Sequence, residues 1–217
     1  MTGFIGPNDP LGGKRGLFSV MSENPKIEPI TDFKTIPFEI MRIYRKPYAA
    51  CRHCHPAIEA ALYIKNNNGV NLLDITSIDI DTYKLAVGGH DHTNIKGEAS
   101  AKLSTPFSVA LALTKDSANL MDFNQDAIND VDILELSRKV RININEELTS
   151  WSPQKRAAIV RVTTNNGDTY SYRVDFPKGE PENPMTQQDI VVKYQELADF
   201  ANIDNKTAND YLKALLK

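Results

Sequence analysis

Side chains that could do chemistry are crowded into one short stretch of this chain. The stretch contains Lys46, Cys51, Arg52, His53, Cys54 and His55. Pro56 follows, and proline suits the first turn of a helix because an N–H at that position would have no helical partner. Ile58, Ala61 and Leu62 then continue at helical spacing. The pattern predicts a loop that leads into the N-terminus of a helix.

Such a loop favours an anion. A helix N-terminus presents free N–H groups and the positive end of the helix dipole. Lys46 and Arg52 add full positive charge, and an arginine can hold a carboxylate through two parallel hydrogen bonds. His53 and His55 are suited to proton transfer near neutral pH. We therefore predict a site for a small carboxylate; the alternative is that His55 only caps the helix and Lys46 is solvated.

A second helix N-terminus is predicted at Ser104, Thr105 and Pro106. Thr105 fits the N-cap and Pro106 the first helical position, and Lys102 stands just upstream. This terminus could bind another anion, or it could be an ordinary cap. Two anion sites would suit a substrate with two or more carboxylates.

A metal site is the competing interpretation of the cysteines. Cys51 and Cys54 have the C-x-x-C spacing, and His90 and His92 could complete a Cys2His2 zinc set. A single C-x-x-C pair is a weak signal, however. A thioredoxin-like redox pair is less favoured, because no parallel βαβ pattern surrounds the cysteines.

The elements that must position these residues follow from periodicity and turn signals. The predicted strands are 38–44, 75–83, 156–164 and 169–176, the last two forming a hairpin around an Asn-Gly turn. The predicted helices are 56–65, one starting at Pro106, 126–140, 187–201 and 207–216. Thr186 and Thr207 each precede an aspartate by three residues, as in a capping box. This order indicates an α+β domain with a mostly antiparallel sheet.

We expect three regions along the chain. Residues 1–30 hold too many glycines and prolines for a domain of their own, yet they include apolar residues that need a surface. Residues 31–178 make the α+β domain. Residues 179–217 form terminal helices whose apolar side chains also need a surface. Both ends are expected to pack on a helical body that is not part of the α+β domain.

Composition excludes several classes of protein. The chain has 217 residues, 41% of them hydrophobic, which is enough for one sizeable core or two small ones. Its 25 basic and 28 acidic residues are interspersed and give a net charge of -3, so a nucleic-acid surface is not expected. No apolar run approaches the length of a membrane span, and no secretory signal is visible. Two cysteines make no disulfide framework, so we expect a cytoplasmic protein.

These motifs together resemble a known family. Residues 46–61 are similar to the K-x-Y-P-x-C-R-x-x-H-x-A-I-D-A-A segment of the MmgE/PrpD family, and residues 101–110 to its A-K/Q-F-S-x-P-Y-x-V-A segment. Residues 3–7 and 14–18 look like its G-F-T-G-P and G-x-R-G-F-F motifs, and residues 178–184 like its closing P-K-G-x-P-x-N-P. The matches keep the family's order over nearly the whole chain, which makes them more specific than any single motif.

The resemblance implies a fold and an activity. Members include 2-methylcitrate dehydratase, cis-aconitate decarboxylase and iminodisuccinate epimerase, which act on small di- and tricarboxylates without a metal or organic cofactor. They combine a large all-helical domain with a smaller α/β lid, have the active site between the two, and are commonly dimers. The resemblance therefore implies a two-layer α/β lid, flanked by N- and C-terminal segments of the helical domain. By match, Lys46 falls on the lid lysine and His55 on a histidine of the same segment, while the turn at 104–107 faces the site.

The chain also departs from the family pattern. Members are considerably longer, and the N-terminal half of their helical domain has no counterpart here. Phe107 stands where many members have tyrosine, and Cys51 where some have histidine.

We expect part of a lyase or epimerase. Lys46 and His55 are its expected catalytic residues. Its expected substrate contacts are Arg52, His53, Lys102, Ser104 and Thr105. A helical partner subunit in a homo- or hetero-oligomer would complete the site, and the isolated chain would be inactive or nearly so. The alternative is a non-enzymatic module that binds zinc through Cys51, Cys54, His90 and His92.

Overall fold

The computed structural model describes residues 8–26 and 38–215, which fall into two compact units. The first unit, Met1–Ile43, contains the short helix α1 (Leu17–Met21) and the 3-10 turn η1 (Glu39–Arg42). The second, Tyr44–Lys217, contains everything else described below. The motif at residues 3–7 lies outside the described residues. The expected boundaries near residues 30 and 178 stay predictions.

The predicted strand at 38–44 is wrong. Residues 39–42 form η1 instead, and the apolar side chains around it are exposed, with Ile40 71% and Met41 74% accessible. β-favouring residues form a strand where they pack on a half-buried pleated surface, and these have none in the described residues.

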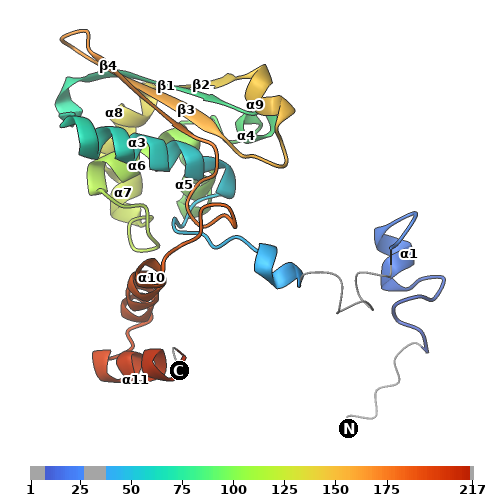
Figure 1. The fold of residues 1–217 in the computed structure, drawn as a ribbon. Coiled ribbons are helices and arrows are strands. Elements are labelled where there is room, and N and C mark those ends of the chain that lie inside the picture. The colour runs from blue at the N-terminus through green and yellow to red at the C-terminus, as the bar shows by residue number, and fades with distance from the viewer. Residues whose placement is uncertain (1–7, 27–37, 216–217) are drawn as a thin grey trace. The chain divides into compact units, whose positions relative to one another are not determined.

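A four-stranded mixed sheet forms one layer of the second unit (Figure 1). Its strands are β1 (Ile75–Thr82), β2 (Val140–Ile144), β3 (Ala158–Thr164) and β4 (Thr169–Val174), in the order β2-β1-β3-β4. β1 pairs with β2 in parallel, whereas β1 with β3 and β3 with β4 are antiparallel. The predicted α+β class with a mostly antiparallel sheet is confirmed.

The alternation of apolar and polar residues had predicted three of these strands. Ile78 and Ile80 of β1 are buried, while Asp79 and Asp81 between them face the other way and stay partly exposed. β3 and β4 are joined at the predicted Asn-Gly turn, where Gly167 has φ 89°. A positive φ favours glycine, which is why this position ends the strand.

The predicted helix at 126–140 is instead two helices and a strand. α7 (Gln125–Asn129) ends before Asp130, whose side chain accepts backbone N–H groups at the start of α8 (Val131–Arg138). Val140 then opens β2 opposite Ile78. Because Asp130 acts as an N-cap, it divides the helical pattern rather than continuing it.

The main helices lie along one side of the sheet (Figure 1). α3 (His55–Asn68) packs on β3 and β4 and on α6 (Thr105–Lys115), which in turn packs on α8. The core between them is fully buried and includes Ile58, Ile64, Ile80, Phe107, Leu111 and Val160. The short η3 (Leu72–Asp74) and α5 (Glu98–Leu103) were not predicted.

A second, smaller core lies beside this one. It joins Tyr83 with residues of α4 (Lys84–Val87), α9 (Glu146–Ser150) and the segment before β3: Ala86, Leu148 and Ala157. It holds Tyr83, whose hydroxyl lies 2.6 Å from the Nδ1 of His53.

Two terminal helices complete the unit. α10 (Gln187–Phe200) begins with the predicted capping box between Thr186 and Asp189. The box predicted at Thr207 is wrong, because Asp204 accepts the N–H groups of Lys206 and Thr207 and α11 (Asn205–Leu215) starts earlier. Large apolar side chains remain exposed on both helices: Ile190, Val192, Leu197, Phe200, Tyr211 and Leu215. Among the residues described, no helix has the length and apolar character needed to cross a membrane.

Candidate functional site

The turn that precedes α3 is held from several parts of the second unit. The N–H of Arg45 donates to the carbonyl of Gly179 at 2.8 Å, and the N–H of Cys51 to that of Lys102 at 2.7 Å. Gly179 has φ 93°, and a Cβ on it would lie 1.8 Å from the Arg45 oxygen, so only glycine fits. The segment around Gly179 therefore fixes the turn on one side and the end of α5 fixes it on the other.

The predicted loop leading into a helix N-terminus is confirmed. The 3-10 turn η2 (Arg52–Cys54) leads directly into α3, which begins at His55 and has Pro56 in its first turn. No side chain of the described residues caps the start of α3, so His55 is not the cap that the alternative interpretation proposed. The helix continues to Asn68, three residues beyond the predicted end at 65, and Gly69 follows it with φ 63°.

Lys46 and His55 meet at one backbone oxygen. The Nζ of Lys46 donates to the carbonyl of Ala50 at 3.3 Å, and the Nε2 of His55 lies 3.2 Å from the same oxygen. Because a carbonyl only accepts, the Nε2 of His55 carries the proton in this contact. Burial lowers the pKa of His55 to about 4, so its imidazole is neutral at pH 7. The two predicted catalytic residues are therefore brought together, one buried and one exposed.

Arg52 is the buried cation of the turn. Only 7% of it is accessible, its guanidinium lies 4.1 Å from the centre of the Tyr44 ring, and Nη2 pairs with Glu180. Its Nη1 is buried with no hydrogen-bond partner among the described residues. A buried N–H without a partner is costly, and a charged one more so. Arg52 thus retains a donor that a carboxylate could accept.

Arg156 adds a second cation, which was not predicted as a site residue. It precedes β3, and its charge is the second cause, after burial, that lowers the pKa of Arg52. It forms no ion pair with any residue in the described ranges. An anion bound beside two like charges lowers the electrostatic repulsion between them. No local pattern marks Arg156, because only the packing of β3 beside the turn brings it near.

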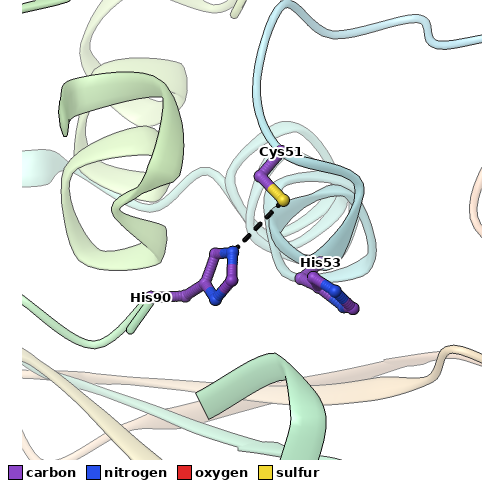
Figure 2. A group of neighbouring side chains, drawn as sticks. All are labelled: Cys51, His53 and His90. Atoms are coloured by element: carbon purple, nitrogen blue, oxygen red, sulfur yellow. Dashed lines mark hydrogen bonds between the residues drawn. The ribbon is translucent and has the colours of Figure 1, made fainter. Parts of the chain in front are cut away.

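His53 contacts a different group of side chains from His55. Its Nδ1 lies 2.6 Å from the Tyr83 hydroxyl, and its ring centre lies 5.0 Å from that of His90. The Nε2 of His90 is in turn 3.2 Å from the sulfur of Cys51 (Figure 2). Burial, and then the charge of His90, lowers the pKa of His53 to about 4. The turn therefore carries a Lys46–His55 pair and, separately, a group around Cys51.

The second predicted anion site is mostly engaged in internal contacts. Ser104, not Thr105 as predicted, is the N-cap of α6: its hydroxyl accepts the N–H of Phe107 at 3.1 Å and donates to the carbonyl of His92. Thr105 donates to the sulfur of Cys54, and both hydroxyl residues are buried. Lys102 lies 3.7 Å from Glu98. The helix start has an ordinary side-chain cap, one residue earlier than predicted, and a role in binding substrate stays a prediction.

The predicted Cys2His2 set is not gathered in the described structure. Cys54 is fully buried, and burial raises the pKa of its thiol to about 12. His92 instead contacts the carbonyl oxygens of Gly89 and Ser100. Within the described ranges, the side chains close enough to share a metal ion are those of Cys51, His53 and His90. Sequence spacing found two of these three.

A hollow adjoins the site through Tyr48. The Tyr48 ring meets the His55 ring edge-on at 5.3 Å, and it also lines a hollow whose far side is formed by α10. Lys178 bonds Asp189 there at 2.7 Å, and this bond, with those from Thr186, lowers the pKa of Asp189 to about 2. The charged face of α10 is thus attached beside the turn.

Comparisons with known proteins agree with this arrangement. A model of the MmgE/PrpD C-terminal domain matches residues 48–214, which include η2, the sheet and nearly all of the two terminal helices, whereas Lys46 lies just before the match. The chain is also similar to a cis-aconitate decarboxylase of Aspergillus terreus, with 25% identity over 166 residues. That match covers 70% of this chain but only 33% of the relative, so the chain spans about a third of the relative's length.

Proposed function

Because the chain belongs to the MmgE/PrpD family, we propose that it forms part of a lyase or epimerase acting on small di- or tricarboxylates. The proposed reaction moves a proton next to a carboxylate, as in dehydration, decarboxylation or epimerisation, and needs no metal or organic cofactor. The observation that carries the proposal is the meeting of Lys46 and His55 at the Ala50 carbonyl, at a helix start with no side-chain cap.

The side chains of the turn suit the separate tasks of such a reaction. Lys46 is exposed, so its ammonium group can bind and orient a substrate carboxylate. Arg52 offers its unpartnered Nη1, and Arg156 adds charge beside it. These cations would also stabilise the negative charge that develops when a proton leaves the carbon next to a carboxylate.

His55 is the proposed proton carrier. In the free protein it is neutral and can accept a proton, because burial and the nearby Lys46 and Arg52 lower its pKa. A bound di- or tricarboxylate would bring negative charge close to the imidazole and raise that pKa towards neutrality. A pKa near the working pH is what a general acid–base group requires. The charge of the substrate would therefore activate the group that reacts with it.

We propose that the other predicted contacts contribute less to the binding of the substrate. His53, Lys102, Ser104 and Thr105 all have partners within the described residues, so a substrate would have to compete for them. Burying a polar group away from its partner costs free energy. We therefore assign the main carboxylate contacts to Lys46 and Arg52.

The chain is proposed to work with a helical half of the kind that completes other members of the family. The exposed apolar side chains of α10 and α11 would pack on that half. It could be supplied by a partner subunit in a cytoplasmic homo- or hetero-oligomer, and the isolated chain would then have little or no activity.

The test is reconstitution. The chain would be produced together with any helical protein that a neighbouring reading frame encodes, and screened for turnover of citrate-like and smaller dicarboxylic acids. Lys46→Ala and His55→Gln should each remove most of the turnover, and Lys84→Ala, an exposed lysine on α4, is the matched control. Turnover that is unchanged by Lys46→Ala would remove the role assigned to Lys46.

A further inference from the structure

Three metal-ligating side chains from two loops converge beside the Lys46–His55 pair. Cys51 and His53 come from the turn before α3, and His90 comes from the loop after α4 (Figure 2). The sulfur of Cys51 and the Nε2 of His90 are 3.2 Å apart, and the three ligand atoms all lie within 4.8 Å of one another. The proposed proton transfer uses neither Cys51 nor His90.

This spacing is close to what a tetrahedral zinc ion requires. With Zn–N bonds of about 2.0–2.1 Å and Zn–S bonds of about 2.3 Å, ligand atoms in a tetrahedron stand roughly 3.3–3.6 Å apart. The Cys51–His90 distance of 3.2 Å falls just below that range, and the outer limit of the group, 4.8 Å, lies roughly 1 Å above it. Rotations of the three partly exposed side chains would close the group around an ion.

The two imidazoles already have the outer contacts that orient metal ligands. The Nδ1 of His90 lies 2.9 Å from the carbonyl of Gly88, and because a carbonyl only accepts, Nδ1 carries the proton there. The lone pair of Nε2 then faces the sulfur of Cys51. The Nδ1 of His53 is held by the Tyr83 hydroxyl at 2.6 Å. Outer partners of this kind fix the ring and tautomer of histidine ligands.

The donor set and the surrounding charge select the ion. One thiolate and two imidazoles favour Zn²⁺ over Mg²⁺ or Ca²⁺, which prefer oxygen ligands. Arg52 and Arg156 place positive charge near His53, and this charge opposes the binding of a cation there. The thiolate of Cys51 offsets one of the two charges of the ion, and an anion or hydroxide at the fourth position offsets the other.

We propose that Cys51, His53 and His90 bind one Zn²⁺ ion, with the fourth position left to an exogenous anion or water. On binding, the Cys51 thiol loses its proton to solvent and the sulfur bonds the ion. The ion ties the loop after α4 to the turn before α3, and so orders the turn that carries Lys46 and His55. The proposal does not depend on the proposed reaction.

The test uses the full chain and the metal alone. Metal-free protein would be titrated with Co²⁺, which reports a thiolate ligand by an intense charge-transfer band, and the Co²⁺ would then be displaced with Zn²⁺. We expect one equivalent of each to bind, whereas Mg²⁺ should not bind. Absence of the thiolate band in the wild-type protein would overturn the proposal.

Variants separate this group from the Cys2His2 set considered from the sequence. Cys51→Ser, His53→Ala and His90→Ala should each weaken Zn²⁺ binding by more than about 100-fold, since losing even an outer partner of a metal site costs about 10–100-fold. His92→Ala and Cys54→Ala are the matched controls and should bind as the wild type does. Equal loss in the controls, or an unchanged band in Cys51→Ser, would contradict the assignment.

A second measurement avoids variants that fail to fold. In the wild-type chain, the imidazole resonances of His53 and His90 should shift on addition of one equivalent of Zn²⁺, while that of His92 should not. Shifts confined to His92, or to none of the three, would overturn the proposal.

Discussion

Helices α3 and α6 both carry a proline in their first turn, yet a side chain caps only α6. At α6 the Ser104 hydroxyl satisfies a backbone N–H and is itself fully buried. At α3 the preceding 3-10 turn presents Arg52 with an unpartnered N–H, and Lys46 and His55 meet nearby. The two termini thus have the same dipole and different surroundings.

The difference separates stability from binding. A capped and buried helix terminus stabilises the fold, because its backbone N–H groups are bonded within the protein, and few of them remain for a ligand. A terminus without a cap, surrounded by cations, keeps its attraction for an anion and is stabilised by contacts from elsewhere in the chain. We therefore expect substitutions at α6 to change the free energy of unfolding, and substitutions of exposed groups at α3 to change binding.

The largest expected effect concerns the ion pair between Arg52, in the turn before α3, and Glu180. Arg52→Met leaves Glu180 without its partner, and the two side chains are only 8% and 12% accessible. Breaking a buried ion pair on one side typically costs about 3–5 kcal/mol in the free energy of unfolding. Urea denaturation would measure the loss. Arg52→Met combined with Glu180→Leu should recover much of it, and a double variant no more stable than the single one would contradict the explanation.

The next effect is a pH dependence that belongs to α3 and not to α6. The folded pKa of His55 is about 4, against 6.5 for an exposed histidine, so the unfolded chain binds the proton more readily. Stability from this group is therefore complete above pH 6.5 and falls as the pH drops towards 4, by about 2–3 kcal/mol.

Urea denaturation between pH 7 and pH 4 would compare the wild type with His55→Gln, whose amide nitrogen can still reach the Ala50 carbonyl. The wild type should lose more stability than the variant over this range. Two parallel curves would show that His55 is not held neutral. The low pKa of Asp189 does not interfere, because its contribution is lost only below about pH 4.

At α6 the cap itself can be removed. Ser104→Ala should lower the free energy of unfolding by about 1–2 kcal/mol, since it removes an N-cap acceptor and also the donor to the His92 carbonyl. Ser171→Ala, on the exposed side of β4, is the matched control and should stay within about 0.5 kcal/mol of the wild type. Thermal and urea denaturation would measure both. A cost as small as that of the control would mean that the cap is not important.

Sequence patterns predicted elements that are defined locally. The alternation of Ile78 and Ile80 with aspartates gave β1, and the Asn-Gly turn gave the hairpin. β2 was missed although Val140 and Ile142 alternate with polar residues, because the helical pattern before it was extended past its end. The strand expected at 38–44 failed for the opposite reason: its residues favour a strand, but none of the described strands pairs with them.

The site divides in the same way. Lys46, Arg52 and His55 are close in sequence, so their association could be predicted. Arg156 and Glu180 reach the turn only through the tertiary fold, and no spacing marks them. The 3-10 turn η2 sets the directions in which the side chains of Cys51 and its neighbours point, and therefore which of them lie together. The order of residues in the sequence does not contain these directions.

The smallest expected change in stability carries the sharpest test of the comparison. Lys46→Ala and Lys102→Ala each remove one lysine near a helix start, and neither should change the free energy of unfolding by more than about 0.5 kcal/mol.

The effects of Lys46→Ala and Lys102→Ala on ligand binding should differ. Among the described residues, Lys46 donates one bond, of 3.3 Å, to a carbonyl and can turn to a ligand, whereas Lys102 already lies near Glu98. Amide chemical-shift titration with citrate would compare the two variants with the wild type. We expect Lys46→Ala to weaken the shifts around residues 46–56 and Lys102→Ala to leave them unchanged. Equal weakening would mean that both helix starts bind carboxylates and that a side-chain cap does not prevent binding, which would restore the two-site hypothesis.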